Sequence, residues 1–222
     1  MSDTDGFIEE VTEEVRRDKM FDLYRRYGWI AVVAVLLLVG VAASNEWQRA
    51  QARTDSEALG DALVAALELD SASDRSAALQ KISVVTADGE AIVRLLTAAE
   101  LVSEDRRQDA LAVLNSIDEN PDVQTIYRQI AEFKALVISA KIHDSEDRRQ
   151  GFKSLIDSGS VLRLLCEEQL ALIEIDAGER DAALMRLQTL LQDSEVTPGM
   201  RRRVSQIITA LGATPGAAQT DG

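Results

Sequence analysis

Residues 91–114, AIVRLLTAAELVSEDRRQDALAVL, contain the pattern that decides the fold. Over 91–103 apolar residues recur every three or four positions, which is the spacing of one face of an α-helix. These residues are Ile92, Leu95, Leu96, Ala99 and Val102. A charged stretch follows, and a second, shorter helical pattern occupies 107–117. The spacing therefore predicts two helices joined by a tight turn.

The same kind of pattern continues through the rest of the chain after Trp47, where no β-type alternation occurs. Long helices are predicted over 121–141, where Pro121 stands at the helix start, and over 161–177, where Gly178 provides a left-handed cap. Shorter helices are predicted over three further stretches: 147–157, 180–192 and 199–211. The predicted fold class of this part of the chain is all-α.

Internal repeats indicate a succession of helical hairpins. The hexapeptide SEDRRQ occurs at 103–108 and again, after a shift of 42 residues, at 145–150. A shift of 73 residues matches four further positions: Ala98 with Ala171, Ala110 with Ala183, Leu111 with Leu184, and Leu114 with Leu187. Read as two periods, 73 residues correspond to about 36 for each hairpin, close to the 34 of a tetratricopeptide repeat. The shift of 42 then implies a few inserted residues in the middle unit.

These repeats predict a tetratricopeptide-like domain of helical hairpins over 48–211. A plain helical bundle is the alternative, because most of the repeat aromatics are missing and Gly151 breaks a short helix. Beyond Gly212 the chain is rich in small and polar residues, which predicts a disordered tail over 212–222.

The composition excludes several classes of protein. The 222 residues include 38 acidic and 24 basic side chains, for a formal net charge of -14, so the basic footprint of a nucleic-acid binder is missing. The single cysteine, Cys166, has no partner for an intramolecular disulfide. Only 12 Gly and 3 Pro also argue against a disordered polymer and a turn-rich β-sandwich.

An uncharged stretch at 28–44, GWIAVVAVLLLVGVAAS, predicts a single transmembrane helix over 28–47. Its 17 residues would span about 26 Å as an α-helix. Trp29 and Trp47 stand at the two ends, where indole rings prefer the headgroup level of a bilayer. Five basic residues precede the stretch and two follow it, which places the N-terminus in the cytoplasm: Arg16, Arg17, Lys19, Arg25 and Arg26, against Arg49 and Arg53.

Two alternatives to a membrane anchor exist. A cleaved signal peptide would use the small residues before Ser44, but the leader of 27 residues is long and acidic for that role. A buried helix of a soluble protein fits poorly with the aromatic residues and the arginine pair beside the stretch. We therefore expect an uncleaved anchor in contact with membrane lipid.

The residues before the stretch predict a cytoplasmic amphipathic arm over 1–27. Apolar residues recur at helical spacing over 7–27, and charged residues occupy the opposite face. Such a helix can lie at the membrane surface, with its basic second half held by anionic lipid. It can alternatively be a docking site for a cytoplasmic or membrane partner.

Few residues are suited to catalysis or to metal binding. His143 is the one histidine and is predicted at a turn, while Cys166 lies on an apolar helical stripe, where a buried and inert thiol is expected. Carboxylates such as Glu167 and Glu168 are interpreted as a solvated acidic face of an amphipathic helix. Motifs for phosphate, calcium or nucleophilic chemistry are lacking, so neither enzyme activity nor a cofactor or metal is expected.

Two segments resemble a known bacterial family. FIEEVTEEVRRDKMFDLYRRYGW at 7–29, followed by one short span and then AIVRLLTAAELVSEDRRQDALAVL, is similar to the YfgM family in its alphaproteobacterial form. The resemblance covers about 7–211, and EEVRRDK…L..RYGW is its most specific part. It implies an inner-membrane protein with a tetratricopeptide-like periplasmic domain, associated with the SecYEG translocon and periplasmic chaperones. It implies no catalysis and no cofactor.

The expected function is therefore that of a membrane-anchored protein-interaction module that helps to hold secreted polypeptides. Trp29, Trp47, Tyr127 and Phe133 are candidate interaction residues, because aromatic anchors dominate protein interfaces. Core burial is the competing interpretation for Tyr127 and Phe133, and it is the one that we prefer for both rings. Two other functions remain open: a scaffold or assembly subunit of another inner-membrane complex, and an envelope enzyme or enzyme regulator, against which the shortage of reactive residues argues. Neither nucleic acid nor a small-molecule substrate is expected.

Overall fold

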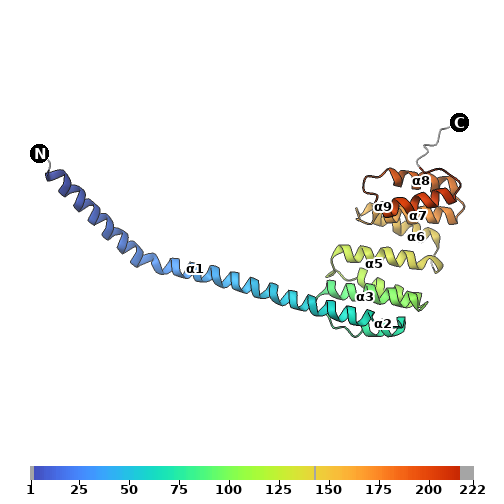
Figure 1. Cartoon of the computed structure of the whole chain (residues 1–222), viewed down its shortest axis with the longest axis horizontal. Coiled ribbons are helices and arrows are strands. Elements are labelled where there is room, and N and C mark those ends of the chain that lie inside the picture. The colour runs from blue at the N-terminus through green and yellow to red at the C-terminus, as the bar shows by residue number, and fades with distance from the viewer. Residues whose placement is uncertain (1–2, 143, 216–222) are drawn as a thin grey trace. The chain divides into compact units, whose positions relative to one another are not determined.

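The structure is a computed structural model that describes residues 3–142 and 144–215, and all regular structure in these ranges is helical (Figure 1). The all-α prediction is therefore confirmed for the described residues. The chain divides into two compact units, 1–58 and 59–222. The first helix, α1 (Asp3–Leu67), runs through the first unit and ends in the second.

Within the first unit, the side chains of residues 1–29, 31, 32, 34 and 35 lie outside the described part, and these include Trp29 and the side chains of the predicted arm. The described apolar side chains of the uncharged stretch, from Ile30 to Val41, are exposed on the helix. Among the described residues, none of the helices combines the length and the apolar character needed to cross a membrane.

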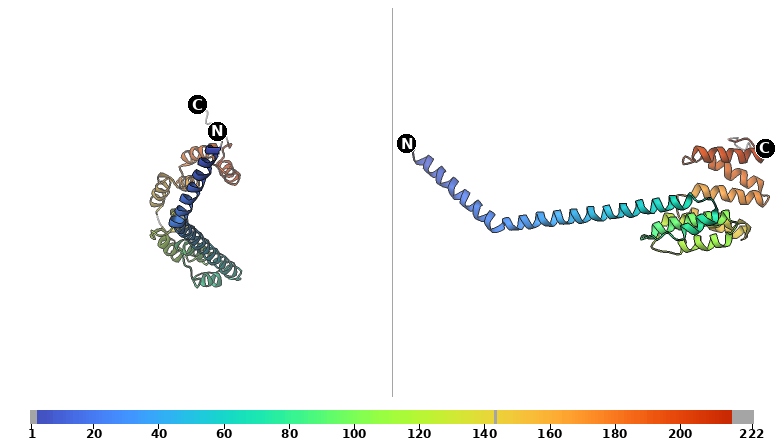
Figure 2. Two further views of the ribbon diagram at one scale, coloured as in Figure 1. Left: turned by 90° about the vertical axis from the view of Figure 1, so that its left-hand side faces the viewer. Right: turned by 60° about the horizontal axis from the view of Figure 1, so that its bottom comes forward.

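The second unit consists of the end of α1 and eight further α-helices with one short 3-10 helix in its described part. Their bounds are α2 (Ala72–Leu79), α3 (Ala87–Ser103), α4 (Arg107–Asp118), α5 (Thr125–Ile138), η1 (Ser139–Lys141), α6 (Ser145–Asp157), α7 (Arg163–Asp176), α8 (Arg180–Gln192) and α9 (Pro198–Ala210). Successive helices pack against one another, so the hairpins follow in chain order (Figures 1 and 2).

The ends of each helix predicted in the second unit lie within four residues of the observed ends, but the prediction differs from the structure in three details. The pattern did not reveal α2. Pro121 lies in the turn before α5, which begins at Thr125 rather than at the proline. Gly151 lies inside α6 and does not break it. A Cβ atom at Gly151 would approach Cδ2 of Leu136 to 2.5 Å, so the missing side chain lets α5 pack closely against α6.

The apolar core consists of four clusters joined by alternate helices. Each of α3, α5 and α7 contributes side chains to two clusters, whereas α2, α4, α6 and α8 each contribute to one. For example, Val93 of α3 packs with Leu79 in the first cluster, while Ala98 of α3 packs with Leu114 in the next. This arrangement couples each hairpin to its neighbours, as in helical-repeat proteins.

The predicted 73-residue repeat corresponds to a real equivalence between the α3–α4 and α7–α8 hairpins. All eight matched residues are buried. The turns also agree, because the amide of Arg106 donates to the carbonyl of Leu101 at 2.9 Å, and the amide of Glu179 donates to that of Glu174 at 2.8 Å. Both turns end their first helix with a left-handed residue, Asp105 (φ 60°) and Gly178 (φ 77°). The predicted left-handed cap at Gly178 is confirmed.

The hexapeptide repeat has no such structural meaning. Its first copy covers the end of α3, the turn and the start of α4, whereas its second copy lies entirely within α6. Burial and small side chains indicate a shift of 41 rather than 42 for the middle hairpin. At that shift, Ser139, Gly151, Phe152 and Leu155 correspond to Ala98, Ala110, Leu111 and Leu114. The letter-for-letter match of six polar residues is therefore one residue out of structural register.

Candidate interaction groove

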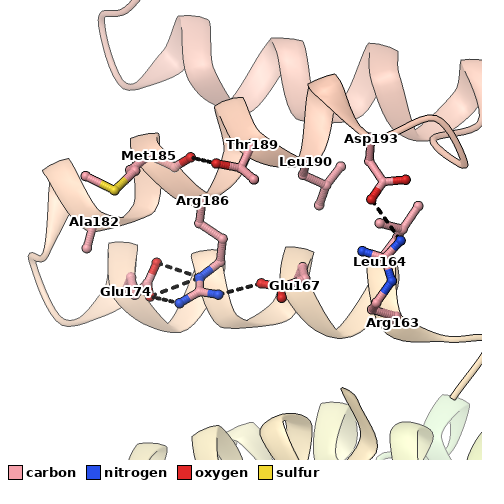
Figure 3. A pocket seen from close by; sticks show the side chains of 10 residues that line it. All are labelled: Arg163, Leu164, Glu167, Glu174, Ala182, Met185, Arg186, Thr189, Leu190 and Asp193. Atoms are coloured by element: carbon pink, nitrogen blue, oxygen red, sulfur yellow. Dashed lines mark hydrogen bonds and ion pairs between the residues drawn. The ribbon is translucent and has the colours of Figure 1, made fainter. Parts of the chain in front are cut away.

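The last complete hairpin has a cavity of about 400 Å³ between α7 and α8, open to solvent on one side (Figure 3). Apolar and charged side chains from both helices line this cavity. They are Arg163, Leu164, Glu167 and Glu174 from α7, and Ala182, Met185, Arg186, Thr189, Leu190 and the adjoining Asp193 from α8 and its end. Because residues four apart share a helix face, Arg186 and Leu190 point from α8 toward the same side of the hairpin.

Arg186 of α8 forms ion pairs across this cavity with two carboxylates of α7. Its guanidinium donates to both carboxylate oxygens of Glu174, from Nη2 to Oε1 at 2.7 Å and from Nε to Oε2 at 3.1 Å, and Nη1 also donates to Glu167 (Figure 3). Glu174 is only 3% exposed, so its charge depends on these donors. The hydrogen bond to Glu174 is the largest cause of a raised pKa for Arg186.

Arg163 forms a second ion cluster at the far end of the cavity. Its Nη2 donates to Asp193 and to Glu195, both at 2.8 Å, and thereby ties α7 to the turn after α8. The pKa of Asp193 is lowered, first by the backbone amide of Glu195, which donates to its carboxylate, and then by Arg163. The carboxylate therefore stays ionised at neutral pH.

A second cavity of about 760 Å³ adjoins the first and shares Arg163 and Leu164 with it. It is bounded by the turn before α7, where Val161 projects, and by the start of α9 with Met200. We call the two cavities together the α7 groove. Arg203 of α9 also lines the second cavity, and it donates from Nε and Nη2 to the buried carboxylate of Glu168, at 2.6 and 2.7 Å.

The ion pairs correct one interpretation of the sequence. Glu168 is buried and Glu167 is partly buried, so these carboxylates form hairpin contacts rather than a solvated acidic face. The spacing of charges on a single helix could not show this, because both arginine partners come from other helices. The 73-residue repeat does contain a signal, since Glu174 and Arg186 replace Leu101 and Val113.

The side chains of Cys166 and Glu132, in the second unit, both have raised pKa values. Burial, and then the charges of Glu132 and Glu167, raise the pKa of the Cys166 thiol to about 12, so the nucleophilic thiolate is absent at neutral pH. The pKa of Glu132 is raised by burial and then by Asp118. Within the described ranges, histidine, cysteine and carboxylate side chains nowhere converge in groups of three that could hold a metal ion. His143 lies outside the described residues.

The candidate interaction residues divide between the two units of the chain. Trp47 is 73% exposed on α1 in the first unit, while the side chain of Trp29 lies outside the described part. Tyr127 and Phe133 both belong to α5, but Tyr127 packs against the α3–α4 cluster and Phe133 against the α6–α7 cluster. The ring of Phe133 meets that of Phe152 edge to face, with centroids 5.7 Å apart.

The chain matches no protein-family model, no curated protein and no solved structure. The resemblance to the YfgM family therefore stays a prediction from the quoted motifs.

Proposed function

We propose that the protein is anchored in a bacterial inner membrane by residues 28–47 and uses its hairpin unit to hold other polypeptides. The observation that carries this proposal is the α7 groove, an open surface of two adjoining cavities on a stack of helical hairpins. Stacked hairpins with such open surfaces suit the binding of a peptide or partner helix, and need no cofactor.

The anchor is supported by the apolar side chains of α1. Leu36, Leu38 and Val41 are among a run of exposed apolar residues, in a stretch that has no charge from 28 to 44. Exposure of such a run to water is unfavourable by roughly 25 cal/mol for each Å² of apolar surface, and lipid removes this cost. Trp47 follows the run at the position of an interfacial ring.

The finer assignment rests on the resemblance to the YfgM family. By that resemblance the protein is an ancillary subunit of the SecYEG translocon, with its N-terminus in the cytoplasm and a tetratricopeptide-like domain in the periplasm. It would link the translocon to periplasmic chaperones and help to hold secreted polypeptides. Attachment to the membrane favours this role, because tethered modules meet at a high effective concentration.

In-cell cross-linking followed by purification of the tagged full chain in mild detergent tests the proposal. We expect to recover translocon subunits and periplasmic folding factors. A matched variant in which 28–47 is replaced by an unrelated membrane span should keep the membrane location and lose the translocon subunits if the span itself forms the contact. Recovery of a different inner-membrane complex, with no translocon subunits above background, would favour the scaffold function instead.

A further inference from the structure

We infer that the α7 groove binds a polypeptide segment that combines apolar and basic side chains. The inference rests on the proposed polypeptide-holding function and adds the place and the chemistry of the segment. Three properties of the groove support it: exposed apolar side chains at its rim, an excess of negative charge among its lining residues, and two neighbouring cavities that share Arg163 and Leu164.

The apolar side chains lie at both cavities. Met185 is 60% exposed beside the first cavity, and Val161 is 79% exposed beside the second. Leu164 lines both cavities and so provides apolar surface between these two residues. Contact with apolar side chains of a partner would remove Met185 and Val161 from water. The flexible thioether of Met185 can also adapt to different partner side chains.

The negative charge of the groove favours a partner whose polar residues are basic. Arg186 lies between two carboxylates, Glu167 and Glu174, and Arg163 likewise lies between Asp193 and Glu195. Among the residues that line or adjoin the groove, each cluster therefore has one more negative than positive charge. Arg149, which is 3.9 Å from Glu174 but does not line the groove, adds no positive excess because it also pairs with Glu146 and Glu179. Arg203 adds no excess positive charge because Glu168 pairs with it. The carboxylate of Glu195 is largely exposed and can accept hydrogen bonds from an incoming lysine or arginine.

The shape of the groove favours an extended chain over a compact molecule. The two cavities neighbour each other with Arg163 and Leu164 lining both, so a chain that fills both must extend across these two residues. Apolar surface at both ends and carboxylates between them match a segment in which lysine or arginine alternates with apolar residues. An acidic segment would place like charges beside Glu167 and Glu195, which opposes its binding.

Peptide binding to the full chain in nanodiscs of zwitterionic lipid tests the inference. The probes are two fluorescent peptides of about a dozen residues that differ in one respect: alternating leucines are separated by lysines in one and by glutamates in the other. Fluorescence anisotropy should show at least about tenfold tighter binding of the lysine peptide, weakening as salt is raised. Empty nanodiscs provide the lipid background for both peptides. Equal affinity for the two peptides would overturn the charge argument.

Three variants locate the binding site. Met185→Gln and Val161→Gln should each weaken binding of the lysine peptide several-fold, because each removes one apolar contact. The matched control is Val85→Gln, which changes a valine that is 87% exposed in the turn before α3 and is not part of the groove. It should bind as the wild type does. Unchanged helical circular dichroism would show that each variant is folded.

The two possible failures are distinguishable. If Met185→Gln and Val161→Gln bind the lysine peptide as tightly as Val85→Gln, the groove is the wrong site, although the proposed polypeptide-holding function stands. If the wild type binds neither peptide above empty nanodiscs, the holding function itself fails, and the groove inference fails with it.

Discussion

The α3–α4 and α7–α8 hairpins have the same backbone turn and the same pairs of small residues at their helix contacts, but they differ in what fills the space between their helices. In α3–α4, Leu101 and Val113 belong to one apolar cluster. In α7–α8 the positions 73 residues later are Glu174 and Arg186, which form a bidentate ion pair. The ion pair thus places two charged side chains in the lining of the cavity between α7 and α8.

This difference teaches that backbone geometry and surface chemistry are set by different residues. Ala98 and Ala110 allow close helix approach in one hairpin, and Ala171 and Ala183 do so in the other. Changing the intervening pair from apolar to charged leaves the turn hydrogen bonds at the same positions. A repeat of this kind can therefore acquire a binding groove without a change of fold.

The largest effect is expected from Phe152, which stands in the middle hairpin where Leu111 and Leu184 stand in the other two. Phe152 is fully buried and meets the ring of Phe133 edge to face. Phe152→Ala should lower the free energy of unfolding by about 3–5 kcal/mol through the lost burial and the cavity left behind. Urea denaturation of the full chain in mild detergent, followed by circular dichroism, measures this loss.

Phe133→Leu is the matched control for that experiment. This substitution keeps most of the apolar volume of a partly buried side chain. It should lower the free energy of unfolding by less than half as much as Phe152→Ala does. A cost below about 1 kcal/mol for Phe152→Ala would mean that the middle hairpin does not share the packing of the other two.

The ion pair of α7–α8 provides the second test. Arg186→Leu leaves the buried carboxylate of Glu174 with Arg149 as its nearest cation, 3.9 Å away, and should cost about 3 kcal/mol. The double variant Glu174→Leu/Arg186→Val recreates the pair found in α3–α4 and should lie within about 1 kcal/mol of the wild type. The double-mutant cycle is measured by the same denaturation experiment. Additive losses in the double variant would show that the two hairpins are not interchangeable at these positions.

Substitutions in the two turns should change the stability by smaller amounts, and the two changes should have opposite signs. Gly178 has φ 77° and open space around its Cβ position, so Gly178→Ala should cost about 1 kcal/mol through backbone strain alone. Asp105 adopts the equivalent conformation at φ 60° with a side chain, so Asp105→Gly should stabilise by a few tenths of a kcal/mol. Thermal denaturation of the two variants compares them. A loss of stability in Asp105→Gly would reveal that its ion pair with Arg107 outweighs the strain.

Cys166 tests the comparison inside the core, because the equivalent residue 73 positions earlier is the buried Val93. Cys166→Val should change stability by less than about 1.5 kcal/mol at neutral pH. The thiol has a pKa of about 12 in the folded state, above its ordinary value of 9.0, so the folded state keeps the proton longer. The wild type should therefore lose stability relative to the variant as the pH rises above 9, and not below it. Denaturation at pH 7 and pH 10 measures the difference, and a constant difference would contradict the pKa.

The fold was largely predictable because helical periodicity and small residues are local signals. The 73-residue shift identified two equivalent hairpins before their packing was known, and Gly178 indicated its own left-handed conformation. The middle hairpin was harder, because its small residues are Ser139 and Gly151 instead of alanines. An identical charged hexapeptide nearby also suggested a register one residue out.

The groove could not be predicted from single helices, because its partners come together only in three dimensions. Arg186 and Glu174 are 12 residues apart and lie on different helices, and Arg203 reaches Glu168 over 35 residues. Aromatic content drew attention to Tyr127 and Phe133, whose rings instead contribute to the core. In a chain poor in aromatics, the few large rings are needed for packing, so exposed Met185 and Val161 are better indicators of an interaction surface.

The alternation of helices that join two clusters with helices that belong to one has a consequence for how the hairpin unit unfolds. Because α3, α5 and α7 each belong to two clusters, opening of one cluster removes support from the next, and a disturbance spreads stepwise along the chain. The outermost helices have neighbours on one side and should fray first. Amide hydrogen exchange should therefore be slowest in α5 and faster toward the two ends of the unit, which are the α1–α2 hairpin and α9.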